Sequence, residues 1–347
     1  MPKSKPLATL SLDLDNQWSY LKTHGDAGWE EFPSYFDRLI PRLLDFLIVR
    51  GLRITVFVVG QDAALERNRA SLRAIAAAGH EIGNHSFRHE PWLHLYSDEE
   101  LETEISSAET AIEQAVGCRP EGFRGPGFSC SPAVLELLAR RGYRYDASTF
   151  PSFLGPLARA YYFFSARLSS QERQERKQLF GKFSEGFKPL RPHWLRPAGE
   201  RLLEIPVTTM PLVKTPIHIS YVLYLSRFSP ALARWYFRQA LRLCRLTRVT
   251  PSILLHPLDF LGCDDGVGLE FFPAMNLTAE HKLAVVSDCL RELTSRFEVL
   301  GLGEFTRRFA GDESESCDEQ ADAGPRAASA GARSAAGQRA VAEVSSA

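Results

Sequence analysis

Short runs of apolar residues alternate with longer amphipathic segments along most of this 347-residue chain. The apolar runs lack a polar alternation, as is typical of strands that are covered on both faces. In the segments between them, apolar residues recur every three or four positions, which predicts helices. This alternation favours a parallel β/α architecture, although the pattern fits an open sheet as well as a barrel.

The pattern assigns most of the chain to definite elements. Strands are expected at residues 8–14, 53–59, 80–83, 122–124, 143–146, 203–207, 252–256 and 297–300. Helices are expected at 35–50, 63–78, 97–116, 131–142, 230–245 and 278–297, with a short one from 303, and a long loop at 16–34. Ser97 with Glu100 is a capping box, and Ser131 before Pro132 is a typical helix start.

Composition changes sharply in two places. Between residues 155 and 255 the chain carries 17 Lys and Arg against 5 Asp and Glu, and it is rich in aromatic residues. We therefore expect one domain over 1–309 with a basic, aromatic helical insertion at about 150–250. Residues 310–347 are rich in Ala, Ser, Gly and Glu and lack aromatic residues, which predicts a disordered tail.

Cysteine usage and hydropathy limit the expected location. The six cysteines are scattered without a C-x-x-C pair, which argues against a zinc ribbon or a disulfide framework and fits a reducing compartment. No apolar leader precedes the first strand, and no apolar run is long enough to span a membrane. We expect a cytoplasmic protein, with the possibility that the insertion rests on the inner face of the membrane.

Two histidines and two acids follow predicted strands. His85 and His89 are four residues apart, and on a helical turn they would lie on the same side as a pair of metal ligands. Asp13 and Asp15 share one face of the first strand, because strand side chains alternate. One of these carboxylates could bind a metal while the other handles protons.

Three more polar residues lie at or after predicted strands. Arg124 ends the short strand at 122–124, Asp146 ends the strand at 143–146 that follows a helix, and His256 ends an apolar strand before Pro257. Because the carboxyl ends of parallel strands form one edge of a sheet, such residues can build a common site.

These segments, in this order, resemble the five motifs of the polysaccharide deacetylase family (carbohydrate esterase family 4, the NodB-homology domain). Asp13-Leu14-Asp15 resembles its first motif in a variant with one residue between the acids, and 85–89 resembles the second. Residues 124–127, Asp146 and 254–256 resemble the third, fourth and fifth. The resemblance implies a distorted (β/α)7 barrel of the TIM-like type.

The metal ligands are expected to be Asp15, His85 and His89. Two imidazoles and one carboxylate, with open positions for water and substrate, suit a hydrolytic metal, and Zn²⁺ is the first choice.

The resemblance also implies how the remaining site residues divide the work. Asp13 would be the general base and His256 the general acid. Arg124 would pair with Asp13 and keep it ionised, and Asp146 would orient His256.

The expected function is a metal-dependent hydrolase that removes an N-acyl group, foremost N-acetyl, from an amino sugar of a glycan or a lipid-linked saccharide. A deformylase of a lipid-linked formamido sugar and a hydrolase of another C–N amide bond are alternatives. The basic, aromatic insertion would either contact anionic lipid or form a simple helical cap on the barrel. An Fe(II) oxygenase and a non-catalytic binding protein remain other readings of the same triad, whereas no nucleic-acid recognition motif is present.

Overall fold

The computed structural model describes residues 4–155 and 183–311 of the chain. The aromatic run at 161–164, which belongs to the predicted insertion, lies outside the described residues. Residues 312–347, which make up nearly all of the predicted tail, lie outside them as well.

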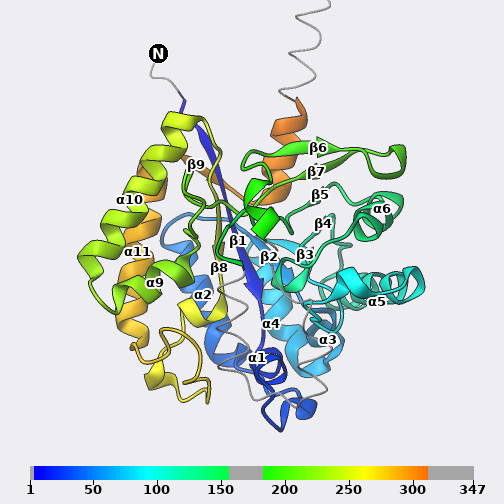
Figure 1. Ribbon diagram of the computed structural model, residues 1–347. Coiled ribbons are helices and arrows are strands. Elements are labelled where there is room, and N and C mark those ends of the chain that lie inside the picture. Colours follow the sequence, from blue (N-terminus) through cyan, green and yellow to red (C-terminus); the bar gives the residue numbers. More distant parts are fainter. Residues whose placement is uncertain (1–3, 156–182, 312–347) are drawn as a thin grey trace, which may run out of the picture. The chain divides into compact units, whose positions relative to one another are not determined.

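A strongly curled sheet forms the centre of the fold (Figure 1). Its strands are β1 (Leu7–Leu14), β2 (Thr55–Val58), β3 (Glu81–Asn84), β4 (Gly122–Phe123), β5 (Tyr145–Asp146), β6 (His193–Leu195), β7 (Leu202–Glu204), β8 (Ser252–Leu255) and β9 (Glu298–Leu300). In the described part of the chain, the parallel strands follow the order β7-β5-β4-β3-β2-β1-β8. Strand β6 pairs antiparallel with β7, and β9 extends the parallel pairing of β1.

The two ends of this strand order approach each other just beyond β7. The backbone N–H of Thr208 donates to the carbonyl oxygen of Ser252 in β8 at 3.0 Å, and the Thr208 hydroxyl accepts the Ser252 N–H at 2.7 Å. The predicted distorted (β/α)7 barrel of the TIM-like type is confirmed. Strands β1, β2 and β8 are buried on both faces, which is why they lack polar alternation.

Helices connect the strands and cover the outside of the sheet (Figure 1). They are α1 (Gln17–His24), α2 (Phe36–Ile48), α3 (Gly60–Ala64), α4 (Glu66–Ala77), α5 (Asp98–Val116), α6 (Pro132–Arg140), α9 (Ile219–Ser226), α10 (Pro230–Thr247) and α11 (Ala279–Arg296). The predicted starts are confirmed where the sequence carries a cap. Ser97 and Glu100 form the expected capping box of α5, and Ser131 caps α6.

Residues 16–34 are not the long loop that their composition predicts. They form α1 and a 3-10 turn, η1 (Trp29–Glu31). The side chain of Asn16 caps α1 and donates to buried Asp62 at 2.7 Å, and the indole of Trp18 donates to the same carboxylate at 3.1 Å. This long-range anchor on Asp62 stabilises a helix that has little amphipathic pattern of its own.

The part of the predicted insertion around residues 219–247 forms the helical connection between β7 and β8. Helix α10 matches the predicted helix at 230–245 and packs with α9 and α11. Its buried residues include Phe237 and Leu241, which belong to the main hydrophobic core. These residues therefore stabilise the barrel in addition to any role at the surface.

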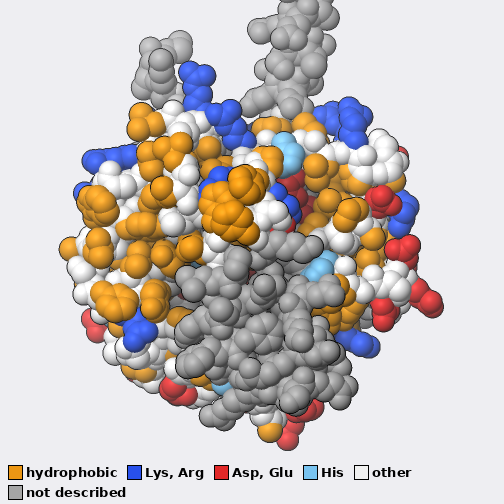
Figure 2. Space-filling view, in the orientation of Figure 1, with side chains coloured by type: hydrophobic (Ala, Val, Ile, Leu, Met, Phe, Trp, Pro, Cys, Tyr) orange, Lys and Arg blue, Asp and Glu red, His pale blue; other side chains and the backbone are white. Residues whose placement is uncertain are grey.

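The outward face of α10 carries an apolar stripe. Leu232, Trp235 and Leu246 recur at helical spacing and are 48%, 56% and 79% exposed. Arg242 is exposed within the same spacing, and we call these four residues the outer stripe. Hydrophobic side chains with Lys and Arg among them are spread over the flank where α9 and α10 lie (Figure 2). Among the described residues, no helix is long and apolar enough to cross a membrane.

Candidate active site

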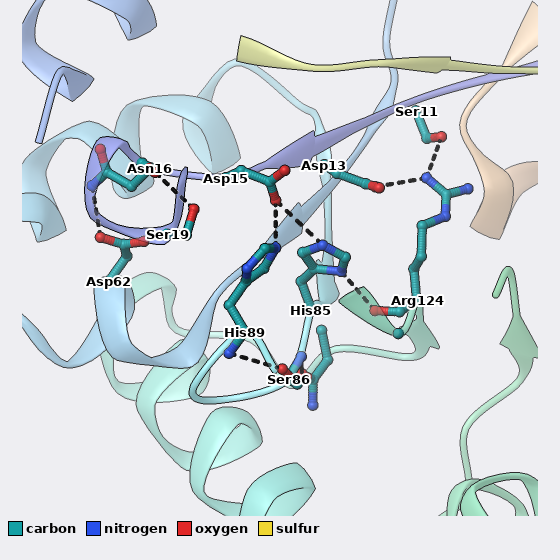
Figure 3. Close-up of polar contacts among 12 residues, drawn as sticks. Ser11, Asp13, Asp15, Asn16, Ser19, Asp62, His85, Ser86, His89 and Arg124 are labelled. Carbon is teal, nitrogen blue, oxygen red and sulfur yellow. Dashed lines mark hydrogen bonds and ion pairs between the residues drawn. The ribbon is translucent and has the colours of Figure 1, made fainter. Parts of the chain in front are cut away.

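Three side chains at the carboxyl ends of β1 and β3 converge on one point (Figure 3). The Nε2 atoms of His85 and His89 lie 3.4 Å and 3.0 Å from Oδ1 of Asp15. Ligand atoms of all three residues lie within 4.8 Å of one another. Two imidazole nitrogens and one carboxylate oxygen can hold a zinc ion and leave positions for water and substrate. The structure thus brings together the three residues predicted as ligands.

The loop that carries both histidines is not the helical turn that their spacing predicts. It is irregular, and Ser86 and His89 adopt left-handed φ angles of 61° and 56°. A buried carboxylate holds this conformation, because Oε1 of Glu104 in α5 accepts the N–H groups of Phe87 and Arg88 at 2.9 Å and 2.6 Å. The two imidazoles meet because the loop folds back on itself around these bonds.

Hydrogen bonding fixes which nitrogen of His85 faces the site. Its Nδ1 lies 2.6 Å from the carbonyl oxygen of Arg124. A carbonyl only accepts, so Nδ1 carries a proton and Nε2 faces Asp15. In a neutral His85 the lone pair of Nε2 therefore points toward the carboxylate oxygen of Asp15. A cation bound between these two atoms stabilises this arrangement.

The charges around this point favour a cation. Burial raises the pKa of Asp15, but His89 and His85 outweigh burial and hold the pKa well below its ordinary value. Burial lowers the pKa of His85, but Asp13 and Asp15 raise it above its ordinary value. Both shifts reflect the strength with which the carboxylates attract positive charge, and the donor set therefore fits a divalent metal.

Asp13 and Arg124 form a buried ion pair beside the three ligands. Nη1 of Arg124 lies 2.7 Å from Oδ1 of Asp13, and it also donates to the hydroxyl of Ser11 at 2.9 Å. Nε donates to the carbonyl oxygen of Ala147 at 3.0 Å, and the side chain is fully buried. Three groups, two on β1 and one just after β5, thus fix the guanidinium, and the contact expected between Arg124 and Asp13 is present.

The predicted contact between Asp146 and His256 is wrong. The carboxylate of Asp146 accepts the hydroxyl and the N–H of Ser148 at 2.6 Å and 3.1 Å, and burial raises its pKa. Glu204 is another neighbour of Asp146. Burial of Glu204 and the charge of Asp146 raise the pKa of Glu204 well above its ordinary value. The hydroxyl of Ser148 in turn accepts the N–H of Gly125 at 2.8 Å. Asp146 therefore supports the loop that follows Arg124.

His256 instead contacts Ser220, a residue that the sequence analysis did not single out. Nδ1 of His256 lies 3.0 Å from the Ser220 hydroxyl, which lies 2.7 Å from Oδ1 of Asp259. His218 lies beside this group, with its ring centre 6.1 Å from that of His256. Burial and the charge of His256 lower the pKa of His218 to about 3, so that His218 is neutral.

Two buried tyrosines complete the surroundings of Asp15, and the sequence analysis missed both. The Tyr35 hydroxyl donates to the carbonyl oxygen of Asp15. Burial raises the pKa of Tyr20 well above its ordinary value, and the nearby carboxylates of Asp15 and Asp259 raise it further. Tyr20 lies on α1, so the helix that composition did not predict also lines the site.

Comparison with known proteins agrees with this arrangement. The family model described as polysaccharide deacetylase matches residues 26–145. A peptidoglycan deacetylase of Helicobacter pylori is 30% identical over 149 residues, which cover 41% of this chain and 49% of that protein. A chitin deacetylase of Colletotrichum lindemuthianum is 32% identical over 106 residues, which cover 30% of this chain and 42% of that protein. The chain thus spans about half the length of these relatives.

Two solved structures have the same fold over most of their length. A protein of Mycobacterium smegmatis assigned as a polysaccharide deacetylase has a TM-score of 0.59 at 19% identity, covering 90% of this chain and 93% of its own. A protein of Pseudomonas aeruginosa with the same assignment has a TM-score of 0.54 at 18% identity, covering 88% and 92%. Residues 26–145 of this chain are thus similar to the polysaccharide deacetylase family, and the chain shares the fold of these two solved structures.

Proposed function

We propose that this protein is a metal-dependent hydrolase that removes N-acetyl groups from the amino sugars of a glycan. The observation that carries the proposal is the convergence of Asp15, His85 and His89 beside the buried pair of Asp13 and Arg124. The names of the relatives, which are deacetylases of peptidoglycan and chitin, support this substrate class.

Asp15, His85 and His89 would hold the metal, and zinc suits this donor set best. When bound, it would polarise the acyl carbonyl and lower the pKa of a coordinated water. The chain contributes the rigidity of the ligands, since Nδ1 of His85 is bonded to a backbone carbonyl and the loop is bonded to Glu104.

The remaining residues would move protons. Asp13 takes a proton from the attacking water, whose oxygen bonds to the acyl carbon. His256 then gives a proton to the amide nitrogen, the C–N bond breaks, and acetate and a free amine leave. Arg124 stabilises the negative charge of Asp13 before Asp13 takes the proton. Arg124 is itself fixed by Ala147, so the ion pair also limits how far the side chain of Asp13 can turn.

Metal content and acetate release test this proposal together. The purified chain should bind about one zinc ion and release acetate from N-acetylglucosamine oligomers or peptidoglycan. A chelator should abolish release and added zinc should restore it. Zinc-loaded protein that releases no acyl group from any glycan or lipid-linked saccharide would overturn the proposal. Release of formate from lipid extracts alone would favour the deformylase of a lipid-linked sugar.

The outer stripe favours a lipid-linked saccharide as a finer proposal. Trp235 and Leu246 could enter the headgroup region of a membrane, while Arg242 meets anionic lipid on the inner face. Segments that combine exposed aromatic and apolar residues with arginine suit this kind of peripheral contact.

Point substitutions test the membrane contact without removing the core residues of α10. We expect Trp235→Glu with Leu246→Glu to reduce sedimentation with phosphatidylglycerol vesicles about tenfold or more, since each change removes apolar burial and adds repulsion. Ile48→Glu is the matched control, because Ile48 is 74% exposed on α2. Equal sedimentation of the double variant, the control and the wild type would reject the contact.

A further inference from the structure

His256 lies in register with the catalytic end of β1. Leu255 of β8 pairs with Leu12 of β1, so His256, which follows β8, comes next to Asp13 of β1 in the same register. The turn after His256 is η7 (Pro257–Asp259). An imidazole at this place can reach the leaving group only if its ring is held in one orientation with Nε2 toward the substrate.

Ser220 and Asp259 form a hydrogen-bonded chain behind this ring. The carboxylate of Asp259 accepts, so the Ser220 hydroxyl donates to it at 2.7 Å. Because the hydroxyl of Ser220 has a single proton and donates it to Asp259, its oxygen must act as the acceptor toward His256. It accepts the N–H of Nδ1 at 3.0 Å. The direction of both bonds places the proton of a neutral His256 on Nδ1 and leaves Nε2 for the site.

We propose that Ser220 is a positioning residue that links His256 to Asp259 and sets the proton-donating form of the imidazole. This inference rests on the proposed hydrolase function, in which His256 protonates the leaving nitrogen. Ser220 lies in the first turn of α9, on the segment whose sequence resembles a surface insertion. The relay therefore gives that segment a part in the reaction.

An intervening hydroxyl has a different effect from a carboxylate in direct contact with the ring. It keeps the negative charge of Asp259 one hydrogen bond further from the ring, so the electrostatic attraction between the two is weaker. Other groups lie near the hydrogen bonds that join His256, Ser220 and Asp259. His218 is neutral, and Lys282 and Tyr20 both interact with Asp259. Asp13 lies next to His256 in the register of β1 and β8, and its carboxylate is paired with Arg124.

Asp259 has a second task that must be separated from the relay. Its Oδ2 accepts the backbone N–H of His256 at 2.8 Å and so caps η7, whereas its Oδ1 accepts from Ser220. Burial raises the pKa of Asp259, and His256, Ser220 and Lys282 oppose that rise. Substitution of Asp259 would disturb both the cap and the relay, but substitution of Ser220 leaves the cap in place.

The decisive experiment compares zinc-loaded Ser220→Ala with Ser226→Ala in the full chain. Ser226 is the matched control, because it is a buried serine at the other end of α9 that donates to the carbonyl oxygen of Leu223. We expect Ser220→Ala to lower kcat by roughly 10–100-fold, the usual cost of losing a partner that orients a functional histidine, with KM and zinc content unchanged. The alkaline limb of the kcat profile should move to lower pH, because the imidazolium loses its link to Asp259.

A second measurement does not depend on activity. The ¹⁵N resonances of the His256 ring should report Nδ1–H in the wild type and in Ser226→Ala, and a mixture of tautomers in Ser220→Ala. Ser220→Thr, which keeps the hydroxyl, should restore both the resonances and the pH profile. Unchanged ¹⁵N shifts and an unchanged alkaline limb in Ser220→Ala would overturn the relay. A wild type without hydrolytic activity but with the expected tautomer would overturn the proposed function while supporting the relay.

Discussion

His85 and His256 are both strand-end imidazoles that use Nδ1 to bind the protein, but they bind different partners. Nδ1 of His85 donates to the backbone carbonyl of Arg124, and Nδ1 of His256 to the hydroxyl of Ser220. A backbone carbonyl cannot rotate or exchange protons, whereas a hydroxyl can do both and here leads to a buried carboxylate. The first arrangement suits a permanent ligand and the second suits a group that gains and loses a proton.

The two environments also differ in how they are built. His85 is almost fully buried among strands of the barrel, and its partner is fixed by the sheet itself. His256 is partly exposed, and its partner comes from α9, a helix on the outer layer. The proposed metal ligand is therefore held by the backbone at the end of a strand, and the proposed proton donor by side chains from separate elements.

The largest effect should come from exchanging each histidine for alanine. His85→Ala should lose zinc and lower activity by about 1000-fold or more, since the metal supplies several kcal/mol to the reaction. His256→Ala should lower kcat by roughly 100- to 10,000-fold, the range for a general acid, and keep one zinc ion per chain. Zinc content by mass spectrometry and acetate release separate the two outcomes. Retention of zinc by His85→Ala would remove the distinction between ligand and acid.

A comparably large effect is expected at the base. Asp13→Asn keeps an oxygen that can accept from Arg124 but cannot take a proton, so kcat should fall roughly 100- to 10,000-fold with zinc content unchanged. Buried Arg124 then lacks a countercharge, and the melting temperature should also fall. Activity assays well below that temperature, with the folded fraction checked by circular dichroism, isolate the chemical effect. Near-normal kcat would assign the base to another group.

The strands, the helix starts and the three candidate ligands could be predicted because their signals are local, whereas the barrel follows from the resemblance in motif order. A buried strand is recognisable from its own composition, and the caps of α5 and α6 lie within four residues of the helix start. The conformation of the loop at 85–89 could not be predicted. It depends on Glu104, which in sequence is one of several acids on an amphipathic helix.

The partner of His256 could not be predicted for the same reason. Ser220 lies between apolar residues in a segment whose composition resembles an insertion, and Asp259 resembles an ordinary turn residue. Its place in the motif order makes Asp146 the expected partner, but its carboxylate binds Ser148, two residues further along the chain, and lies beside Glu204, its register partner on β7. Motif order predicts which strand ends meet at one edge, but not which side chains touch there.

A moderate effect on metal affinity should follow from removal of the carboxylate that holds the loop. Glu104→Ala leaves the N–H groups of Phe87 and Arg88 without their acceptor, so zinc affinity should fall roughly 10–100-fold. Excess zinc should recover most of the activity, because the ligands themselves are intact. Glu104→Gln keeps an accepting oxygen and should bind zinc nearly as the wild type does. Competition with a chelating dye measures these affinities. If Glu104→Ala binds zinc as tightly as the wild type does, the loop at 85–89 keeps its conformation without Glu104.

The smallest effect on activity, but a distinct effect on stability, is expected at Lys282 behind the His256 turn. Lys282 is 1% exposed, and its ammonium donates to the carbonyl oxygens of Leu258 and Leu261, both at 2.8 Å. Burial lowers its pKa from 10.5 to about 8. Lys282→Met fills the same space without these bonds, so the turn should loosen slightly and kcat should fall less than about tenfold.

The stability of the wild type and that of Lys282→Met should depend differently on pH. Between about pH 8 and 10.5 the unfolded chain holds a proton on Lys282 that the folded chain has released, so the stability of the wild type rises with pH in this window. Across this window the free energy of unfolding of the wild type should rise by about 3 kcal/mol relative to that of Lys282→Met, which is the equivalent of the pKa difference. Below pH 8 the difference between the two proteins should no longer change with pH. Urea unfolding of both proteins with a chelator present, from pH 7 to pH 10, measures this difference. Parallel stability curves would mean that the burial of Lys282 does not disfavour its charge, and that its two carbonyl partners compensate fully for lost water.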